Sequence, residues 1–119
     1  MQMTFHPSFP FAAALLLGAT LLPHAAHGAP PPDDARQHEL RRLVRDECGS
    51  CHGLTLRGGL GPALTPDRLA PLPAESLAAT ILYGRPGTAM PPWRRFLGDA
   101  EAQWIVEELR RGLPALSRP

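Results

Sequence analysis

The sequence predicts an all-α domain wrapped around a cofactor, on three observations. Apolar residues recur at helical spacing in three separate segments. The long connections between these segments are dense in glycine and proline, which excludes long regular structure there. No segment alternates between apolar and polar residues as a strand would. We therefore expect three main helices, with long loops that surround something other than side chains.

The first 28 of the 119 residues have the pattern of a cleaved secretory signal. An apolar run, FAAALLLGATLL from Phe11 to Leu22, is too short to span a bilayer and leads to small residues ending at Gly28. No lysine or arginine precedes Arg36, so an uncleaved anchor or a misassigned start is the alternative. After the signal, residues 29–34 are expected to form a flexible proline-rich entry and residues 35–119 a single domain in the periplasm.

Composition excludes several classes of partner. The formal net charge is +1, from 12 arginines, no lysine and 11 acidic residues spread along the chain, so no nucleic-acid binding is expected. A mature chain of about 90 residues buries a small fraction of its surface and is expected to need a cofactor, metal or disulfide for stability.

The first predicted helix covers residues 35–47, with Asp33 or Asp34 as its N-cap. Its apolar positions are three and four residues apart, and arginines occupy positions between them. These apolar residues are Leu40, Leu43 and Val44.

Two further helices follow the glycine- and proline-rich stretch. One is predicted to start with Pro73 at its first helical position and to end at Gly84, with the apolar pair Leu77 and Ile81. The last is predicted from an N-cap at Asp99 to about Arg111, with Gly112 ending it. Its apolar stripe comprises Ala102, Ile105, Val106, Leu109 and Leu113.

The segment Cys48-Gly49-Ser50-Cys51-His52 has the C-x-x-C-H pattern of covalent haem attachment. Two thiols three positions apart on one helical turn can reach both vinyl groups, and the following histidine can approach the iron. The alternatives are a redox-active disulfide, which would need a βαβ context, and a zinc site, which would need four ligands. The chain has only two cysteines, and the predicted elements show no βαβ unit. We therefore predict one covalent haem c.

Met90 is the candidate sixth ligand because it is the only methionine outside the predicted leader. It stands in a loop between Gly87 and two prolines, a place that suits a fixed ligand better than a side chain that fills a core gap. His38 on the first predicted helix is a competing ligand, and a five-coordinate iron open to small ligands is a further alternative.

The chain resembles the class I cytochrome c family over the whole predicted domain. Two segments, CGSCHGLTLRGGLGPAL (48–64) and ILYGRPGTAMPPW (81–93), are similar to the small monohaem cytochromes encoded beside cytochrome cd-type nitrite reductase in denitrifying bacteria. The resemblance implies thioethers at Cys48 and Cys51, with His52 and Met90 as iron ligands. It also implies that the carbonyl of Pro62 holds the imidazole, and that Trp104 and Leu109 pack where the last helix crosses the first near Leu40 and Val44.

Trp93 and the arginines around it have two open interpretations. The indole of Trp93 either donates to a haem propionate or only packs. Arg85, Arg94 and Arg95 pair with propionates, face an acidic partner or are simply solvated. The absence of lysine sets the chain apart from cytochromes that dock through a lysine ring.

A haem with two axial protein ligands has no position for substrate, so we expect a one-electron carrier and no enzyme. The resemblance implies that it takes electrons from a quinol-oxidising chain and donates them to cytochrome cd-type nitrite reductase in denitrification. The alternative is an accessory role in maturation of the d-type haem of that reductase. We expect a monomer with no membrane span once the signal is removed.

Overall fold

The computed structural model describes residues 1–2 and 30–113, and all regular structure within them is helical. The predicted leader, apart from its first two residues, lies outside the described part, as do residues 114–119 of the predicted domain. The elements are α1 (Asp34–Leu43), the π-helical turn η1 (Val44–Cys48), α2 (Gly49–His52), α3 (Pro66–Leu69), α4 (Ala74–Tyr83) and α5 (Asp99–Arg111). The all-α prediction is confirmed for the described residues.

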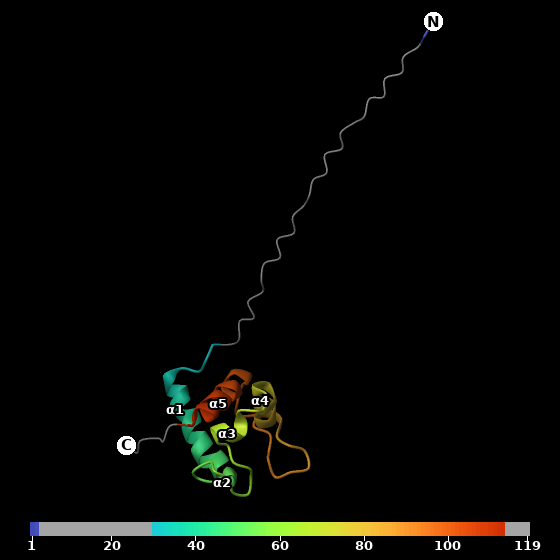
Figure 1. Ribbon diagram of the computed structural model, residues 1–119. Coiled ribbons are helices and arrows are strands. Elements are labelled where there is room, and N and C mark those ends of the chain that lie inside the picture. The colour runs from blue at the N-terminus through green and yellow to red at the C-terminus, as the bar shows by residue number, and fades with distance from the viewer. Residues whose placement is uncertain (3–29, 114–119) are drawn as a thin grey trace.

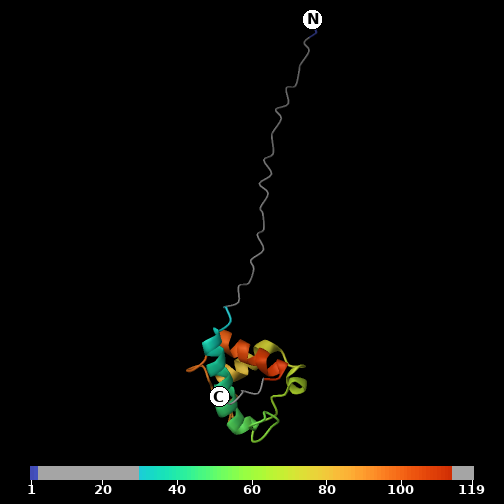
Figure 2. The same ribbon diagram turned by 90° about the vertical axis from the view of Figure 1, so that its left-hand side faces the viewer.

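The helices form one layer of crossing rods with the loops gathered at one end. Figure 1 shows α1 and α2 as a continuous column, with α5 crossing beside α1 and α4 lying on the other side of α5. The view in Figure 2 agrees, with α5 in the middle of the molecule and the loop after α2 at its lower end. None of the described helices is both long and apolar enough to cross a membrane.

The first predicted helix is present and continues beyond its predicted end. Asp33 is the N-cap, because its carboxylate accepts a hydrogen bond from the backbone N–H of Arg36 at 2.8 Å. The helix then widens into η1 and resumes as α2, which ends at His52. Such π-helical turns occur often at functional sites. The whole cysteine–histidine motif is therefore carried on helical backbone.

The α4 helix begins one residue later than predicted. Pro73 is its N-cap, with φ −59° and ψ 135°, so Ala74 and not Pro73 is the first helical residue. Gly84 ends the helix as predicted, with a φ of +68° that a side chain would disfavour. The short helix α3, whose first residue is Pro66, lies in a segment for which only loops were predicted.

The buried face of α4 differs from the predicted pair. The residues that it buries in the core are Ala78 and Leu82, at 5 % and 4 % exposure. Leu77 and Ile81 are only partly buried and pack against the edge of that core. Each predicted residue immediately precedes a buried one, because the core lies one position further around the helix.

The α5 helix spans its predicted residues, with Gly112 at its C-cap, but its N-cap is Gly98 and not Asp99. The carboxylate of Glu101 accepts a hydrogen bond from the backbone N–H of Gly98 at 2.8 Å. The Asp99 carboxylate instead pairs with Arg94. The ion pair thus takes the side chain that was expected to cap the helix.

The crossing of α1 and α5 is held by apolar and charged contacts together. Trp104 and Leu109 share one core cluster with Leu40 and Val44, as the resemblance implied. Across the same crossing, Arg36 pairs with Glu101 at 2.6 Å, and Arg41 pairs with the buried Glu108 at 3.0 Å. The Arg41 guanidinium also lies 5.0 Å from the ring centroid of Trp104.

Candidate haem site

The two cysteines lie on successive helical segments, Cys48 at the end of η1 and Cys51 within α2. Both are half-buried and neither forms a disulfide. Burial raises the pKa of the Cys48 thiol to about 11, so this side chain is a neutral thiol at physiological pH. Redox-active C-x-x-C pairs carry a cysteine of lowered pKa, so the shift disfavours the redox-disulfide interpretation.

His52 is buried, and its ring orientation is set by one hydrogen bond. Its Nδ1 lies 2.6 Å from the carbonyl oxygen of Pro62, which is the contact that the resemblance implied. A carbonyl oxygen can only accept, so Nδ1 carries the proton and donates. The other nitrogen, Nε2, then has a free lone pair, which is the form of imidazole that binds a metal.

Gly61 packs directly against the imidazole. A Cβ at this position would lie 2.8 Å from both Cε1 and Nδ1 of His52. Any side chain here would therefore displace the ring or the loop. The sequence offered no signal that singled out Gly61, since it is one glycine among several in this loop.

The loop after α2 folds back onto the end of that helix through its backbone. The N–H of Gly58 donates to the carbonyl of His52 at 2.8 Å, and the N–H of Gly61 donates to that of Cys51 at 2.8 Å. These bonds satisfy carbonyls that the helix end leaves free. The loop that supplies Pro62 is therefore fixed to the helix that supplies His52.

The loop that carries Met90 begins and ends on α4. Its backbone passes so close to Gly84 that a Cβ there would lie 2.7 Å from the carbonyl oxygen of Met90. That oxygen also accepts a hydrogen bond from the N–H of Arg85 at 3.2 Å. On the return, the N–H of Trp93 donates to Ile81 O at 3.1 Å, next to a similar bond from Arg94 to Leu82. The loop is thus closed on the last turn of the helix.

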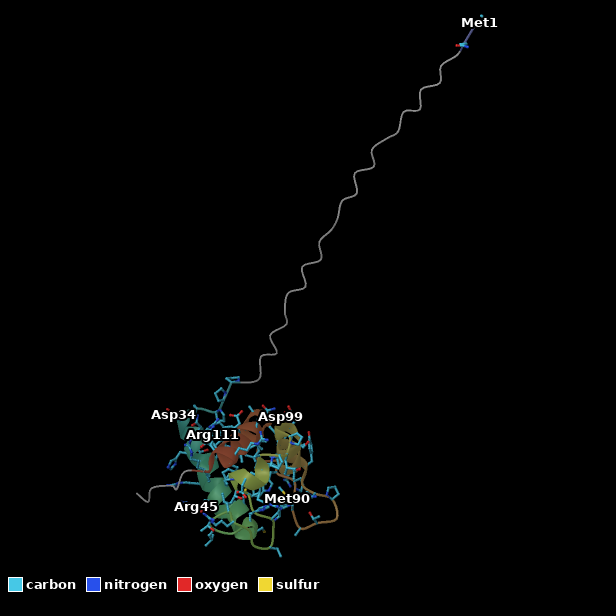
Figure 3. All side chains as sticks on the ribbon, viewed as in Figure 1. Met1, Asp34, Arg45, Met90, Asp99 and Arg111 are labelled. Atoms are coloured by element: carbon cyan, nitrogen blue, oxygen red, sulfur yellow. The ribbon has the colours of Figure 1, made fainter. Side chains whose placement is uncertain are left out.

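Met90 is half-buried within this closed loop. Figure 3 shows it in the lower half of the molecule, where the loops after α2 and α4 lie, whereas Asp99 lies near the top. His38, the competing ligand, is exposed on α1.

Trp93 and Arg94 have protein partners in the structure. Trp93 packs against the core cluster, and its ring lies 5.9 Å from that of Phe96. Arg94 pairs with Asp99, which raises the pKa of the arginine and lowers that of the carboxylate, and its guanidinium lies 6.0 Å from the ring centroid of Tyr83. Arg85 and Arg95 are exposed.

These residues fit a covalently bound haem. Two neutral thiols, one imidazole with a free Nε2 and one thioether form the donor set that the group requires. Apolar side chains from both loops and from α4 are only partly buried, which leaves apolar surface for a flat ring to cover; they are Leu56, Leu64, Leu77, Ile81 and Trp93.

Comparison with protein families gives one match that covers more than half of the chain. The model described as "Cytochrome C oxidase, cbb3-type, subunit III" matches residues 35–107. This range includes every residue of the site described above.

Curated relatives and solved structures point to the same family. Cytochrome c55X of Pseudomonas aeruginosa is 57 % identical over 81 residues, which are 68 % of each chain. Cytochrome c55X of Paracoccus denitrificans is 56 % identical over 81 residues, 68 % of this chain and 79 % of that one. A solved structure of the c-type cytochrome NirC has a TM-score of 0.67 at 56 % identity and covers 69 % of this chain and 96 % of that chain.

A larger protein contains a similar segment. Dihydro-heme d1 dehydrogenase of Pseudomonas aeruginosa is 36 % identical over 103 residues, 87 % of this chain but only 18 % of that protein. With the Cys48–Cys51 attachment motif in place, the chain belongs to the cytochrome c family: it carries one covalently bound haem c and transfers electrons, and it is not an enzyme.

Proposed function

We propose that the protein is a periplasmic one-electron carrier whose haem iron is held by His52 and Met90, and that it donates electrons to cytochrome cd-type nitrite reductase. The observation that carries the ligand assignment is the hydrogen bond from His52 Nδ1 to Pro62 O, at 2.6 Å, which leaves Nε2 free. The acceptor is taken from the resemblance to monohaem cytochromes encoded beside that reductase.

The chain's own residues set the properties of such a carrier. The haem, when bound, supplies a one-electron ferric/ferrous couple. Pro62 holds the His52 imidazole in one orientation and increases its donor strength. The thioether of Met90 is a soft ligand that favours the reduced state. With both axial positions occupied by side chains, small ligands are excluded from the iron.

Export agrees with this role. The leader pattern of residues 1–28 places the mature domain, residues 35–119, in the periplasm after cleavage. There it would receive electrons from a quinol-oxidising chain in the membrane and act as a monomer in denitrification.

The ligand assignment is tested by the far-red sulfur-to-iron charge-transfer band of the oxidised protein. Met90→Ala should abolish the band and open the iron to cyanide or carbon monoxide, while His38→Ala should leave the band unchanged. A Met90→Ala protein that kept the band would overturn the assignment.

The acceptor is tested by stopped-flow mixing of the reduced protein with cytochrome cd-type nitrite reductase. Rapid haem oxidation that is sustained only when nitrite is present is the expected result. Slow oxidation by a protein with an intact far-red band would remove the reductase as its acceptor.

A second function is favoured by the similarity to dihydro-heme d1 dehydrogenase. A dehydrogenation releases electrons that a carrier must accept, so a separate small cytochrome of similar sequence would suit that step. In this case the protein serves maturation of the d-type haem. A deletion strain should then make reductase with little d-type haem, and full d-type haem content in that strain would exclude the role.

A further inference from the structure

Carboxylates are absent from the two chain segments that carry the proposed ligands. We call residues 48–66 and 76–98 the two site segments; together they make up about half of the chain between residues 30 and 113. None of the 11 acidic residues lies in them, and all 11 lie elsewhere in the described chain. The site segments do contain four arginines, which are Arg57, Arg85, Arg94 and Arg95. Positive charge is therefore concentrated on the segments that surround the site.

Three of these arginines are exposed and have no carboxylate as an ion-pair partner. Arg94 pairs with Asp99, whereas no ion pair involves Arg57, Arg85 or Arg95 in the described part of the chain. Elsewhere the charges are mostly matched, as for Arg36 with Glu101 and Arg41 with Glu108. The unmatched charge on the site segments is thus available to something outside the chain.

Large apolar side chains are exposed on the same segments. Leu54 and Leu60, in the loop after α2, are 79 % and 82 % exposed. Tyr83 and Phe96, which border the Met90 loop, are 62 % and 64 % exposed. Among the described residues beyond Met1, the one other large apolar side chain that is exposed is Leu72. Apolar surface surrounded by charge of one sign is typical of a protein contact.

The two loops lie near one another in space. Figure 1 shows the loop after α2 and the loop after α4 both in the lower half of the molecule, while the N-terminal ends of α1 and α5 lie at the top. Arg57 belongs to the first loop and Arg85 to the second.

We propose that the two site segments form the docking surface for a protein whose own surface carries carboxylates around its redox centre. This inference rests on the proposed role as an electron carrier and adds the chemistry of its partner. Arg57, Arg85 and Arg95 attract the acidic surface over a long range, and the apolar side chains are buried at contact. Only three cations are unmatched, too few for the dense clusters that bind lipid headgroups or nucleic acid.

Pairing with haem propionates is the competing explanation for a carboxylate-free site, because the group brings two carboxylates of its own. The two explanations differ in what an arginine controls. A docking arginine changes the rate of encounter with a charged partner and its dependence on salt. An arginine that pairs with a propionate changes the reduction potential instead.

The test uses small oxidants of opposite charge, so that it does not depend on the identity of the natural acceptor. The reduced protein is mixed with hexacyanoferrate(III), an anion, or with tris(phenanthroline)cobalt(III), a cation, over a range of ionic strength. In each reaction one electron leaves the ferrous haem and reduces the metal of the oxidant by one unit. The variants are Arg57→Gln, Arg85→Gln and Arg95→Gln, singly and combined. The matched control is Arg42→Gln, an exposed arginine of α1 that forms no ion pair in the described chain.

The wild-type rate with the anion should fall as salt is added, and that with the cation should rise. Each site-segment substitution should slow the anion reaction roughly threefold at low ionic strength, and the triple variant should remove most of the salt dependence. Arg42→Gln should change either rate far less. Reduction potentials and the far-red band should stay at their wild-type values.

Two results would overturn the proposal. One is equal loss of rate in Arg42→Gln and in the site-segment variants, which would mean that only net charge matters. The other is a shifted reduction potential with an unchanged salt dependence, which would assign the arginines to the propionates. If the small oxidants behave as expected but cytochrome cd-type nitrite reductase is not reduced, the docking surface stands and the proposed acceptor fails.

Discussion

Gly61→Ala adds one methyl group against the His52 imidazole, and its effect can be worked out from the structure. The new Cβ would lie 2.8 Å from Cε1 and Nδ1 of the ring. Carbon atoms pack best at about 3.5–4.0 Å, so the ring or the loop must move by about 0.7 Å or more. The φ of Gly61 is not positive, so alanine is allowed by the backbone and the clash with the ring acts alone.

A movement of this size bears on the hydrogen bond that sets the ring. The bond from His52 Nδ1 to Pro62 O is 2.6 Å long, and a shift of about 0.7 Å takes it to the limit of a hydrogen bond. Overpacking of a tight site costs about 1–3 kcal/mol, which for a domain of this size lowers the Tm by at least about 4 °C. A weaker bond to Pro62 also makes His52 a poorer donor, so the reduction potential should rise.

Thermal unfolding followed by circular dichroism and a potentiometric titration, both on the haem-bound protein, measure these effects. Gly49→Ala is the matched control, because a Cβ there meets its neighbours at 3.7 Å or more in a helical backbone. It should leave the potential unchanged and the Tm equal or slightly higher. A Gly61→Ala protein with the Tm and potential of the wild type would refute the packing described for the imidazole.

Three further substitutions follow from contacts elsewhere in the domain. Gly84→Ala would place a Cβ 2.7 Å from the carbonyl oxygen of Met90 at a φ of +68°, so the far-red band should weaken and stability should fall by about 1–3 kcal/mol; an unchanged spectrum would show that the loop does not depend on this contact. Arg41→Met removes a partner of the buried Glu108 and the cation over Trp104, and should cost about 1–3 kcal/mol in urea unfolding, whereas Arg42→Met on the exposed side of α1 should cost little; equal losses would contradict the buried pair. The hydrogen bond from Arg36 holds the pKa of Glu101 below its ordinary value, so this pair stabilises the fold above the ordinary glutamate pKa of about 4.3, and its contribution is lost as the pH falls through the lowered value. The difference in unfolding free energy between the wild type and Arg36→Gln should therefore be present at neutral pH and vanish in strong acid, and a difference that grew on acidification would exclude the linkage.

Much of the helical architecture was predictable because local signals and tertiary packing agree. The boundaries of α5 follow from its apolar stripe and from Gly112, and the N-cap at Asp33 follows from residue type alone. The cap of α5 was wrong because Arg94, five residues away, engages the Asp99 carboxylate, and a side-chain pairing of this kind leaves no mark in a single sequence. The buried face of α4 was shifted by one position because the core that selects it is built from α1 and α5.

For the site, the motif identified the cysteines and the histidine, and uniqueness identified the methionine. The positions that hold these residues in place, Gly61 and Gly84, were not predicted as such. Each matters only because another segment passes within contact of its α-carbon, over His52 in one case and over the backbone of Met90 in the other. Contacts between distant backbone segments are set by the fold, so they had to be read from the structure.

The way in which the Met90 loop is fastened bears on how such a protein can change over time. Both anchors of the loop lie on the last turn of α4: Gly84 and Arg85 where the chain leaves, and the carbonyls of Ile81 and Leu82 where it returns. Residues added or removed between these anchors alter the span between them while the hydrogen bonds at its two ends keep their places, so the path of the chain into α5 is preserved. The residue presented to the cofactor is therefore one of the parts of this domain that mutation can revise separately, and exchange of the 86–89 stretch is a direct way to tune one ligand without redesigning the helices around it.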